Sequence, residues 1–185
     1  MTVQAKASRI KVILFDVDGV LTDGKVVVHA NGTESKEFNI RDGIAMVWAQ
    51  RAGLRVGFLS ARTSATTPHR AAQLGVTLVY HGVSSKIETF ERILSDLAVR
   101  DDEVAYMGDD IVDLAVLDRA GLSAAPADAV DEVRGRVDFV ARSKGGEGAA
   151  RELIEMILRV QQAWDAIVAG YAEEGRAVPE AGGKP

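Results

Sequence analysis

Two carboxylates one residue apart follow an apolar run in the stretch VILFDVDGVLTDG, residues 12–24. An apolar run such as Ile10 to Phe15 is typical of a strand that is buried on both faces. A hydrophobic core has no use for Asp16 and Asp18. Carboxylates bind hard metal ions, attack phosphoryl groups and exchange protons with leaving groups or water. The pair therefore favours metal or acid–base chemistry at the end of the first strand.

Other reactive side chains follow the later apolar runs of the chain. They are Ser60 and Arg62 in GFLSAR, Lys86 after YHGVSS, and Asp109, Asp110 and Asp113 in GDDIVD. Ligands of doubly wound sheets bind beyond the carboxyl ends of the strands, so these residues are expected to meet on one rim. Asp16 and Asp109 offer the anionic oxygens that Mg²⁺ prefers. Lys86 and Ser60 would hold the other oxygens of a bound phosphate.

These residue types together describe a site for phosphoryl transfer. Asp16 would attack the phosphorus as a nucleophile and form an aspartyl phosphate. Asp18 would protonate the leaving alkoxide and then take a proton from water. The metal ion and the lysine would offset the charge repulsion between a carboxylate and a phosphate.

The elements that must position this site alternate along the chain. Apolar runs at 10–15, 55–59, 77–80, 103–107 and 121–124 predict strands, and stretches near 42–52, 63–74, 84–98, 110–119 and 147–169 predict helices. This alternation predicts an α/β fold, a doubly wound parallel sheet with helices on both faces. At 25–40, Asn31-Gly32 between two β-prone segments predicts a β-hairpin inserted after the first strand.

The composition of the chain limits the number of domains, the partners and the cellular location that can be expected. The chain has 185 residues, of which 47% are hydrophobic, and this predicts one domain, at residues 1–165. Residues 166–185 are expected to form a helix end and a disordered tail. The excess of 27 acidic over 22 basic residues argues against a nucleic-acid partner. No run approaches the roughly 18 apolar residues of a membrane span. The absence of cysteine fits a reducing cytoplasm, where we expect the protein to act.

The sequence contains motifs that resemble those of a known superfamily. DVDG, Ser60, Lys86 and GDDxxD, in this order, are similar to the four motifs of the haloacid dehalogenase superfamily of phosphotransferases. More narrowly, DVDGVLTDG, FNIRDG, GDDIVDLAVL and GGEGAARE together resemble the 3-deoxy-D-manno-octulosonate 8-phosphate phosphatase family, over roughly residues 9–165.

The resemblance implies a Mg²⁺-dependent phosphomonoesterase that releases 3-deoxy-D-manno-octulosonate and phosphate in lipopolysaccharide precursor synthesis. The roles that it implies are Asp16 as nucleophile and metal ligand, Asp18 as general acid/base and backbone-carbonyl metal ligand, Asp109 as the other carboxylate ligand, Ser60 and Lys86 as phosphate ligands, and Asp110 and Asp113 as supports of the metal shell.

The spacing of the motifs leaves no room for a cap domain over the site. About 40 residues separate Asp18 from Ser60, and the hairpin and one helix use them. The resemblance implies that capless members form homotetramers in which neighbouring subunits wall the active site. Residues 26–28 are three valines in a row, which leave apolar side chains on both faces of the hairpin and fit burial in an interface.

Polar residues after the hairpin are candidates for contacts to a sugar acid. A 2-keto-3-deoxy sugar acid carries a carboxylate, and the planar fork of arginine suits that group. Arg41 is the first candidate, reaching across from a neighbouring subunit. Lys36 and Arg62 are further substrate-binding candidates.

Two other kinds of acidic site fit the sequence less well than a phosphatase site does. Two alternative functions of the same fold stay open. An EF-hand loop counted from Asp16 would need oxygen ligands where Val20 and Val27 stand. A receiver domain carries its phosphorylated aspartate after the third strand, where this chain has His81-Gly82. The open alternatives are a phosphatase of nonulosonate 9-phosphates, whose substrates are also 2-keto sugar acids, and a non-catalytic oligomerising module.

Overall fold

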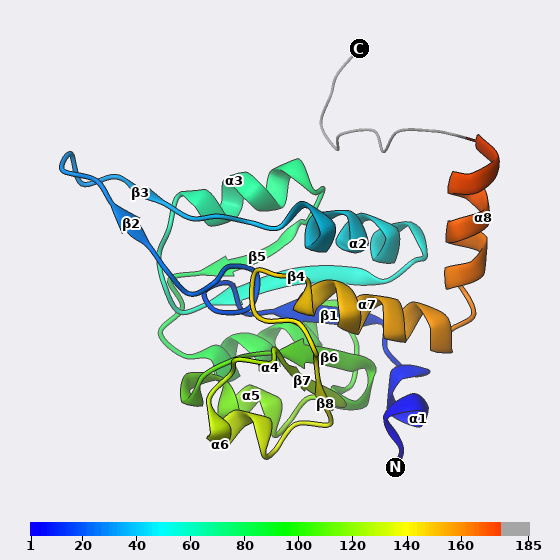
Figure 1. The fold of residues 1–185 in the computed structure, drawn as a ribbon. Helices are drawn as coiled ribbons and strands as arrows, with labels where there is room; N and C mark the ends of the chain where they lie inside the picture. Colours follow the sequence, from blue (N-terminus) through cyan, green and yellow to red (C-terminus); the bar gives the residue numbers. More distant parts are fainter. Residues whose placement is uncertain (175–185) are drawn as a thin grey trace.

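The computed structural model describes residues 1–174, and a six-stranded parallel sheet forms its centre (Figure 1). The strands are β1 (Val12–Phe15), β4 (Arg55–Ser60), β5 (Leu78–His81), β6 (Val104–Met107), β7 (Leu122–Ala125) and β8 (Phe139–Val140). Their order across the sheet is β5-β4-β1-β6-β7-β8. The chain winds outward from β1 to β5 and then from β6 to β8, so the winding reverses between β1 and β6. Such a reversal opens a crevice at the carboxyl ends of the strands.

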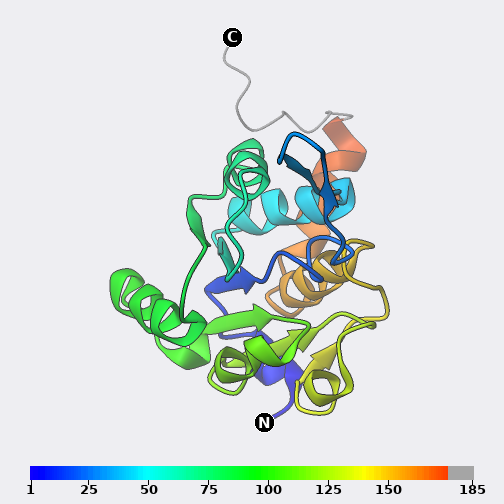
Figure 2. The ribbon, with the colours of Figure 1, turned by 90° about the vertical axis from the view of Figure 1, so that its left-hand side faces the viewer.

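Helices cover both faces of this sheet. They are α1 (Val3–Ala7), α2 (Ile40–Arg51), α3 (Thr66–Gln73), α4 (Lys86–Leu97), α5 (Leu114–Leu117), α6 (Asp131–Arg134), α7 (Ala149–Val160) and α8 (Trp164–Glu174), with short 3₁₀ turns at Asp101–Glu103 and Ile111–Asp113. Figure 2 looks at the molecule from the left of Figure 1, with α4, α5 and α6 on one side of the strands and α2, α3 and α7 on the other. The doubly wound parallel sheet predicted from the sequence is confirmed.

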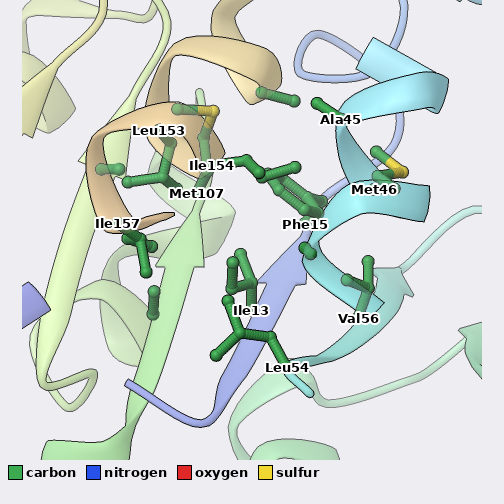
Figure 3. Packing of buried hydrophobic residues seen from close by; sticks show 14 of the residues in the cluster. Ile13, Phe15, Ala45, Met46, Leu54, Val56, Met107, Leu153, Ile154 and Ile157 are labelled. Carbon is green, nitrogen blue, oxygen red and sulfur yellow. The ribbon is translucent and has the colours of Figure 1, made fainter. Parts of the chain in front are cut away.

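The central strand β1 supplies side chains to two separate cores. Ile13 and Phe15 point to the face that α2 and α7 cover, and Val12 and Leu14 point to the face of α4 and α5. All four are fully buried. Figure 3 shows Phe15 directed toward Met46 of α2 and Ile154 of α7, beside Met107 of β6. Because both faces of β1 are packed, the residue that follows it is held at a fixed place.

The hairpin predicted after the first strand is present and antiparallel. It pairs β2 (Val27–Val28) with β3 (Glu34–Ser35) and projects to the left of the body in Figure 1. Val27 and Val28 are 58% and 72% exposed, so their apolar side chains have no cover within residues 1–174. Within this range, the chain between β1 and β4 contains only this hairpin and α2, and no cap domain.

The single helix predicted at 147–169 is wrong, because the chain forms two helices there. Gln162 adopts a left-handed conformation at φ 60°, which ends α7 and turns the chain. Trp164 then packs at 8% exposure against Trp48 of α2, with ring centroids 5.4 Å apart. This aromatic contact docks α8 on the body.

Four further elements differ from expectation. The helix expected at 110–119 is a 3₁₀ turn followed by α5, and the sequence predicts none of α1, α6 and β8. Helix α8 crosses the expected domain end at 165, and residues 175–185 of the expected disordered tail lie outside the described residues. No helix in residues 1–174 has the length and apolar character needed to span a membrane.

Candidate active site

Asp16 and Asp109 lie side by side at the point where the winding of the sheet reverses. Phe15 of β1 pairs with Met107 of β6, and the Asp16 N–H donates to the Met107 carbonyl at 3.0 Å. Asp16 directly follows β1, and Asp109 follows β6 after one glycine. One carboxylate oxygen from each of Asp16, Asp109 and Asp113 lies within 4.8 Å of the other two. Two neighbouring parallel strands thus deliver their carboxylates to one place.

Lys86 neutralises part of this negative charge from the first turn of α4. Its Nζ lies 2.9 Å from Oδ1 of Asp16 and 2.6 Å from Oδ1 of Asp113. The lysine side chain is 5% exposed and the two carboxylates 8% and 0%, so the pairs are shielded from water. Ser85 caps α4 through the Glu88 N–H, which fixes the helix end that carries Lys86.

Asp113 uses all of its hydrogen-bonding capacity within the protein. Oδ1 accepts from Lys86 and from the hydroxyl of Tyr106, and Oδ2 accepts the N–H groups of Asp109 at 3.1 Å and Asp110 at 3.4 Å. These bonds hold the loop that carries Asp109. Asp113 is therefore placed to orient this loop rather than to bind a ligand itself.

Burial and crowding set the electrostatics of the site. Burial and, after it, the charges of Asp16 and Asp113 together raise the pKa of Asp109 to about 8, against the opposing effect of Lys86. Burial also raises the pKa of Asp16, against the opposing effect of Lys86. Burial alone would lower the pKa of Lys86, but Asp16 and Asp113 outweigh it and the pKa is raised. Ionising all three carboxylates would place more negative charge here than one ammonium offsets, so the site favours a further cation or a proton.

The residues present fit a divalent cation such as Mg²⁺. Oδ1 of Asp109 is buried and has no hydrogen-bond partner within residues 1–174, a costly arrangement for a carboxylate. Mg²⁺ binds oxygen ligands and is commonly held by one or two carboxylates together with water and phosphate. Asp113 is already saturated, so Asp16 and Asp109 are the carboxylates available to a metal ion.

A tight loop after Asp18 closes one side of this carboxylate pair. Gly19 has φ 93°, a left-handed conformation that glycine adopts without strain. The buried Thr22 holds the loop, because its Oγ1 accepts the N–H groups of Gly19 and Gly24 at 3.3 and 3.2 Å. The backbone of Asp18 and Gly19 is thereby brought next to Asp109.

Two of the sequence motifs, FNIRDG and GGEGAARE, support this loop from outside. Asn39 donates to the Gly146 carbonyl at 3.0 Å, and the Gly146 N–H donates to the carbonyl of Val20 at 3.0 Å. Asp42 of α2 accepts the N–H of Arg151 in the first turn of α7 at 2.8 Å. Asp42 is buried and is not part of the carboxylate cluster, and its contacts join α2 to α7.

The residues predicted to bind phosphate lie around the same crevice. Ser60 ends β4 next to β1 and is 2% exposed, and its Oγ accepts the Arg62 N–H at 3.2 Å. Lys86 contacts Asp16 directly. Asp110 is exposed and caps the 3₁₀ turn through the Ile111 N–H at 2.6 Å. The structure brings Ser60 and Lys86 to the rim together with Asp16 and Asp109, while the roles assigned to all four stay predictions.

The residues predicted to contact the sugar are placed differently. Lys36 forms an ion pair with Asp18, and Arg62 forms one with Glu34 of the hairpin at 2.6 Å. Arg41 is exposed at the start of α2, and its guanidinium forms no hydrogen bond or ion pair within residues 1–174. Two of the three candidates are thus engaged inside the chain, and Arg41 is free to meet another group.

The sequence analysis assigns no role to Thr22 or Tyr106, and it does not reveal the partner of Asp42, which follows the hairpin among the candidates for substrate contacts. A signal existed for Thr22, because a threonine between glycines in a turn is a frequent side-chain cap of backbone N–H groups. Tyr106 is the one hydroxyl in the otherwise apolar β6, and a buried tyrosine hydroxyl needs a partner. The partner of Asp42 belongs to α7, which is distant in sequence, so local patterns could not reveal it.

Comparisons with known proteins agree with this geometry. A sequence model of the haloacid dehalogenase-like hydrolases matches residues 70–153. The chain is 41% identical over 159 residues to 3-deoxy-D-manno-octulosonate 8-phosphate phosphatase KdsC of Escherichia coli (strain B / BL21-DE3), which covers 86% of this chain and 85% of that protein.

Two solved structures are similar over nearly the whole chain. One is the 3-deoxy-D-manno-octulosonate 8-phosphate phosphatase of Moraxella catarrhalis in complex with a magnesium ion, a phosphate ion and a KDO molecule. It is 31% identical, with a TM-score of 0.89, over 91% of this chain and 97% of that one. The other is the cobalt-bound deoxy-D-mannose-octulosonate 8-phosphate phosphatase of Haemophilus influenzae. It is 37% identical, with a TM-score of 0.86, over 91% of this chain and 99% of that one.

Proposed function

The chain belongs to the 3-deoxy-D-manno-octulosonate 8-phosphate phosphatase family of the haloacid dehalogenase-like hydrolases, and we propose that it hydrolyses this sugar-acid phosphate with Mg²⁺ as cofactor. The products are 3-deoxy-D-manno-octulosonate and phosphate, and the pathway is lipopolysaccharide precursor synthesis. The observation that carries the proposal is the placement of Asp16 beside Asp109 with Lys86 2.9 Å from Asp16.

The two carboxylates of the DVDG motif have different roles in the reaction. A carboxylate oxygen of Asp16 attacks phosphorus, the bond from phosphorus to the sugar oxygen breaks, and Asp18 gives its proton to that leaving oxygen. Asp18 then takes a proton from water, which attacks the phosphorus of the aspartyl phosphate. The bond from phosphorus to Asp16 breaks and phosphate leaves, with Asp16 again a carboxylate and Asp18 again protonated.

The surrounding residues hold the phosphate and the cofactor. Asp16, Asp109 and the backbone carbonyl of Asp18 would hold Mg²⁺, which supplies positive charge against the phosphate when bound. Lys86 already lies against Asp16 and would share its donors with the phosphate oxygens. Ser60 would donate its hydroxyl from the end of β4.

The same proposal extends to assembly and to the sugar. We place the protein in the cytoplasm, as a homotetramer whose neighbouring subunits wall the open site. Exposed apolar side chains near the site support this, namely Val27, Val28 and Ile40 at 58%, 72% and 80% exposure. Arg41 follows Ile40 and would reach the sugar carboxylate of a neighbouring site. Light scattering should then give four times the mass of one chain, and a fully active monomer would contradict the arrangement.

Phosphate release from a substrate panel tests the activity. The panel holds 3-deoxy-D-manno-octulosonate 8-phosphate, N-acetylneuraminate 9-phosphate, its deaminated analogue, glucose 6-phosphate and p-nitrophenyl phosphate, with Asp16→Asn as the blank. We expect kcat/KM on the octulosonate to exceed the others at least tenfold, about 1.4 kcal/mol of discrimination. Preference for a nonulosonate would change the substrate and keep the chemistry. No turnover of any compound would contradict the proposal and favour a non-catalytic module.

Arg41 is tested within the same panel. Arg41→Ala should raise KM for the octulosonate phosphate and leave KM for p-nitrophenyl phosphate unchanged, because only the sugar acid carries the carboxylate. An equal change for both compounds would remove Arg41 from substrate recognition.

A further inference from the structure

The side chain of Lys36 is completely buried against Asp18. Its Nζ donates a hydrogen bond to Oδ2 of Asp18 at 2.9 Å and lies 2.7 Å from Oδ1, which is buried and accepts no hydrogen bond within residues 1–174. The lysine side chain is 0% exposed and the aspartate side chain 22%. Asp18 forms no other ion pair within residues 1–174. Lys36 is thus its single charged partner in the described structure.

The chain holds Lys36 firmly on both sides. On the preceding side, Glu34 of β3 pairs with Arg62 at 2.6 Å, which ties the hairpin to the loop after β4. On the following side, Phe38 packs against the core of the α2 face. Asn39 caps α2 through the Arg41 N–H and also donates to the Gly146 carbonyl. The position of the ammonium is therefore set by the fold and not by the flexibility of the lysine side chain.

The contact limits how the Asp18 carboxylate can turn. An aspartate at the rim of an open crevice has two side-chain torsions that are free unless other groups restrict them. A buried ammonium that hydrogen-bonds one oxygen and forms an ion pair with the carboxylate supplies that restriction, because breaking the pair would leave a buried charge without a partner. No cap domain covers the site within residues 1–174 to restrict Asp18 from above.

We propose that Lys36 is a positioning residue, which holds the Asp18 carboxylate toward the oxygen of the leaving group. The inference rests on the proposed phosphatase activity and replaces the expectation that Lys36 binds the sugar. In the first step Asp18 gives its proton to the leaving oxygen, and in the second it takes one from water. Lys36 exchanges no proton in either step, and it keeps one carboxylate oxygen in place while the other reacts. The hairpin that carries Lys36 thus contributes to proton transfer in its own subunit.

A series of aryl phosphates separates this role from substrate binding. Aryl phosphates lack the sugar carboxylate, so a residue that only recognises the sugar does not affect them. 2,4-Dinitrophenolate leaves without a proton, whereas phenolate needs one, and general acids contribute about 10²–10⁴-fold to such steps. In Lys36→Met we expect kcat/KM to fall roughly 10- to 100-fold on phenyl phosphate and less than about threefold on 2,4-dinitrophenyl phosphate.

A double-mutant cycle then tests whether Lys36 acts through Asp18. Asp18→Asn should also lower kcat/KM more on phenyl phosphate than on 2,4-dinitrophenyl phosphate, and the difference should be larger than in Lys36→Met. Adding Lys36→Met to Asp18→Asn should cause less than about a twofold further loss, because the group that Lys36 positions is already gone. If the losses in kcat/KM of the two single variants multiplied in the double variant, the two residues would act independently, and the inference would be overturned.

Control variants distinguish a positioning role of Lys36 from a general effect of losing a lysine or from misfolding. Lys25→Met removes an exposed hairpin lysine, paired with Asp23, and should behave as wild type throughout. Lys36→Arg keeps a cation and should restore part of the phenyl phosphate activity, and it serves also if Lys36→Met does not fold. An unchanged leaving-group dependence in both Lys36 variants would overturn the inference, as would a rise in KM confined to the sugar-acid phosphate. If the wild type released no phosphate from any compound of the panel, the octulosonate phosphate included, above the Asp16→Asn blank, the proposed function would fail and this inference with it.

Discussion

Gly19 approaches Asp109 so closely that a β-carbon at residue 19 would lie 2.0 Å from Oδ2 of that aspartate. The two residues belong to different motifs, DVDG and GDD, which are about 90 positions apart in the chain. Gly19 also has φ 93°, where other residues are strained. The glycine of DVDG therefore does more than permit a turn, because it lets the loop rest against a proposed metal ligand.

Replacing Gly19 by alanine should disable the site more than it destabilises the fold. We expect Gly19→Ala to lower kcat/KM by at least about 100-fold, since displacing reacting groups by about 1 Å costs this much. The strained φ should cost about 1–3 kcal/mol of unfolding free energy. Gly32→Ala is the matched control, because Gly32 has φ 82° but nothing within 4 Å of a β-carbon. It should lose some stability and no activity, and equal activity losses in the two variants would refute the argument.

Lys86 should matter for stability as well as for activity. Lys86→Met leaves the buried carboxylates of Asp16 and Asp113 without their cation. Removing one partner of a buried ion pair costs about 3–5 kcal/mol. We expect urea denaturation to show a loss of this size, together with loss of phosphate release. Lys25→Met, which removes an exposed pair, should unfold like the wild type. A Lys86→Met protein as stable as wild type would show that the carboxylates relax or become protonated without penalty.

Much of the fold followed from local patterns. The apolar runs marked five of the six strands of the sheet, and Asn31-Gly32 marked the hairpin, because these signals depend on residues close together in sequence. The two-residue strand β8 is too short to show any alternation. The break between α7 and α8 depends on Gln162, a residue type that usually continues a helix, so its left-handed conformation was not predictable.

The residues of the site also fall into those that local sequence patterns locate and those that they do not. Residues at strand ends, such as Asp16, Ser60 and Asp109, could be located because the ends of parallel strands meet on one rim. The partners of Lys36 and Arg62 could not, since each contact joins segments whose separation is set by the path of the hairpin. The sequence makes a charged residue near a predicted site a candidate substrate contact, and the structure shows that the protein itself supplies a counter-ion to Lys36 and Arg62.

Metal binding should be measurable without catalysis. If Asp109 is a ligand, Mg²⁺ at about 100 times its dissociation constant adds about 2.7 kcal/mol to the free energy of unfolding. In a chain of this size that corresponds to a rise in melting temperature of roughly 5–10 °C over protein in EDTA. Asp109→Asn should abolish the rise. Asp110→Asn should keep it, because Asp110 is exposed and asparagine also caps a helical turn. Loss of the shift in both variants would mean that Asp110 holds the metal too.

Asp42 makes stability depend on pH at a place remote from the carboxylate cluster. Burial raises its pKa from 3.8 to about 6, although the N–H groups of Arg151 and Gly148 partly oppose this shift. Its Oδ2 is buried and has no hydrogen-bond partner within residues 1–174. The folded protein thus prefers the protonated acid. Between about pH 4 and 6 the folded state binds more protons than the unfolded state, so the free energy of unfolding falls as the pH rises through this window.

The size and direction of this effect can be tested with one substitution. A shift of this size corresponds to about 2–3 kcal/mol lost between pH 4 and 7. Asp42→Asn keeps an oxygen for the two N–H groups and cannot ionise. Relative to wild type, it should therefore gain stability as the pH rises from 4.5 to 7.5, measured by urea denaturation with Mg²⁺ held constant. Asp96→Asn, which changes an exposed carboxylate on α4, is the surface control. A stability difference between Asp42→Asn and wild type that did not change with pH would mean that Asp42 stays ionised in the folded protein, held by the first turn of α7.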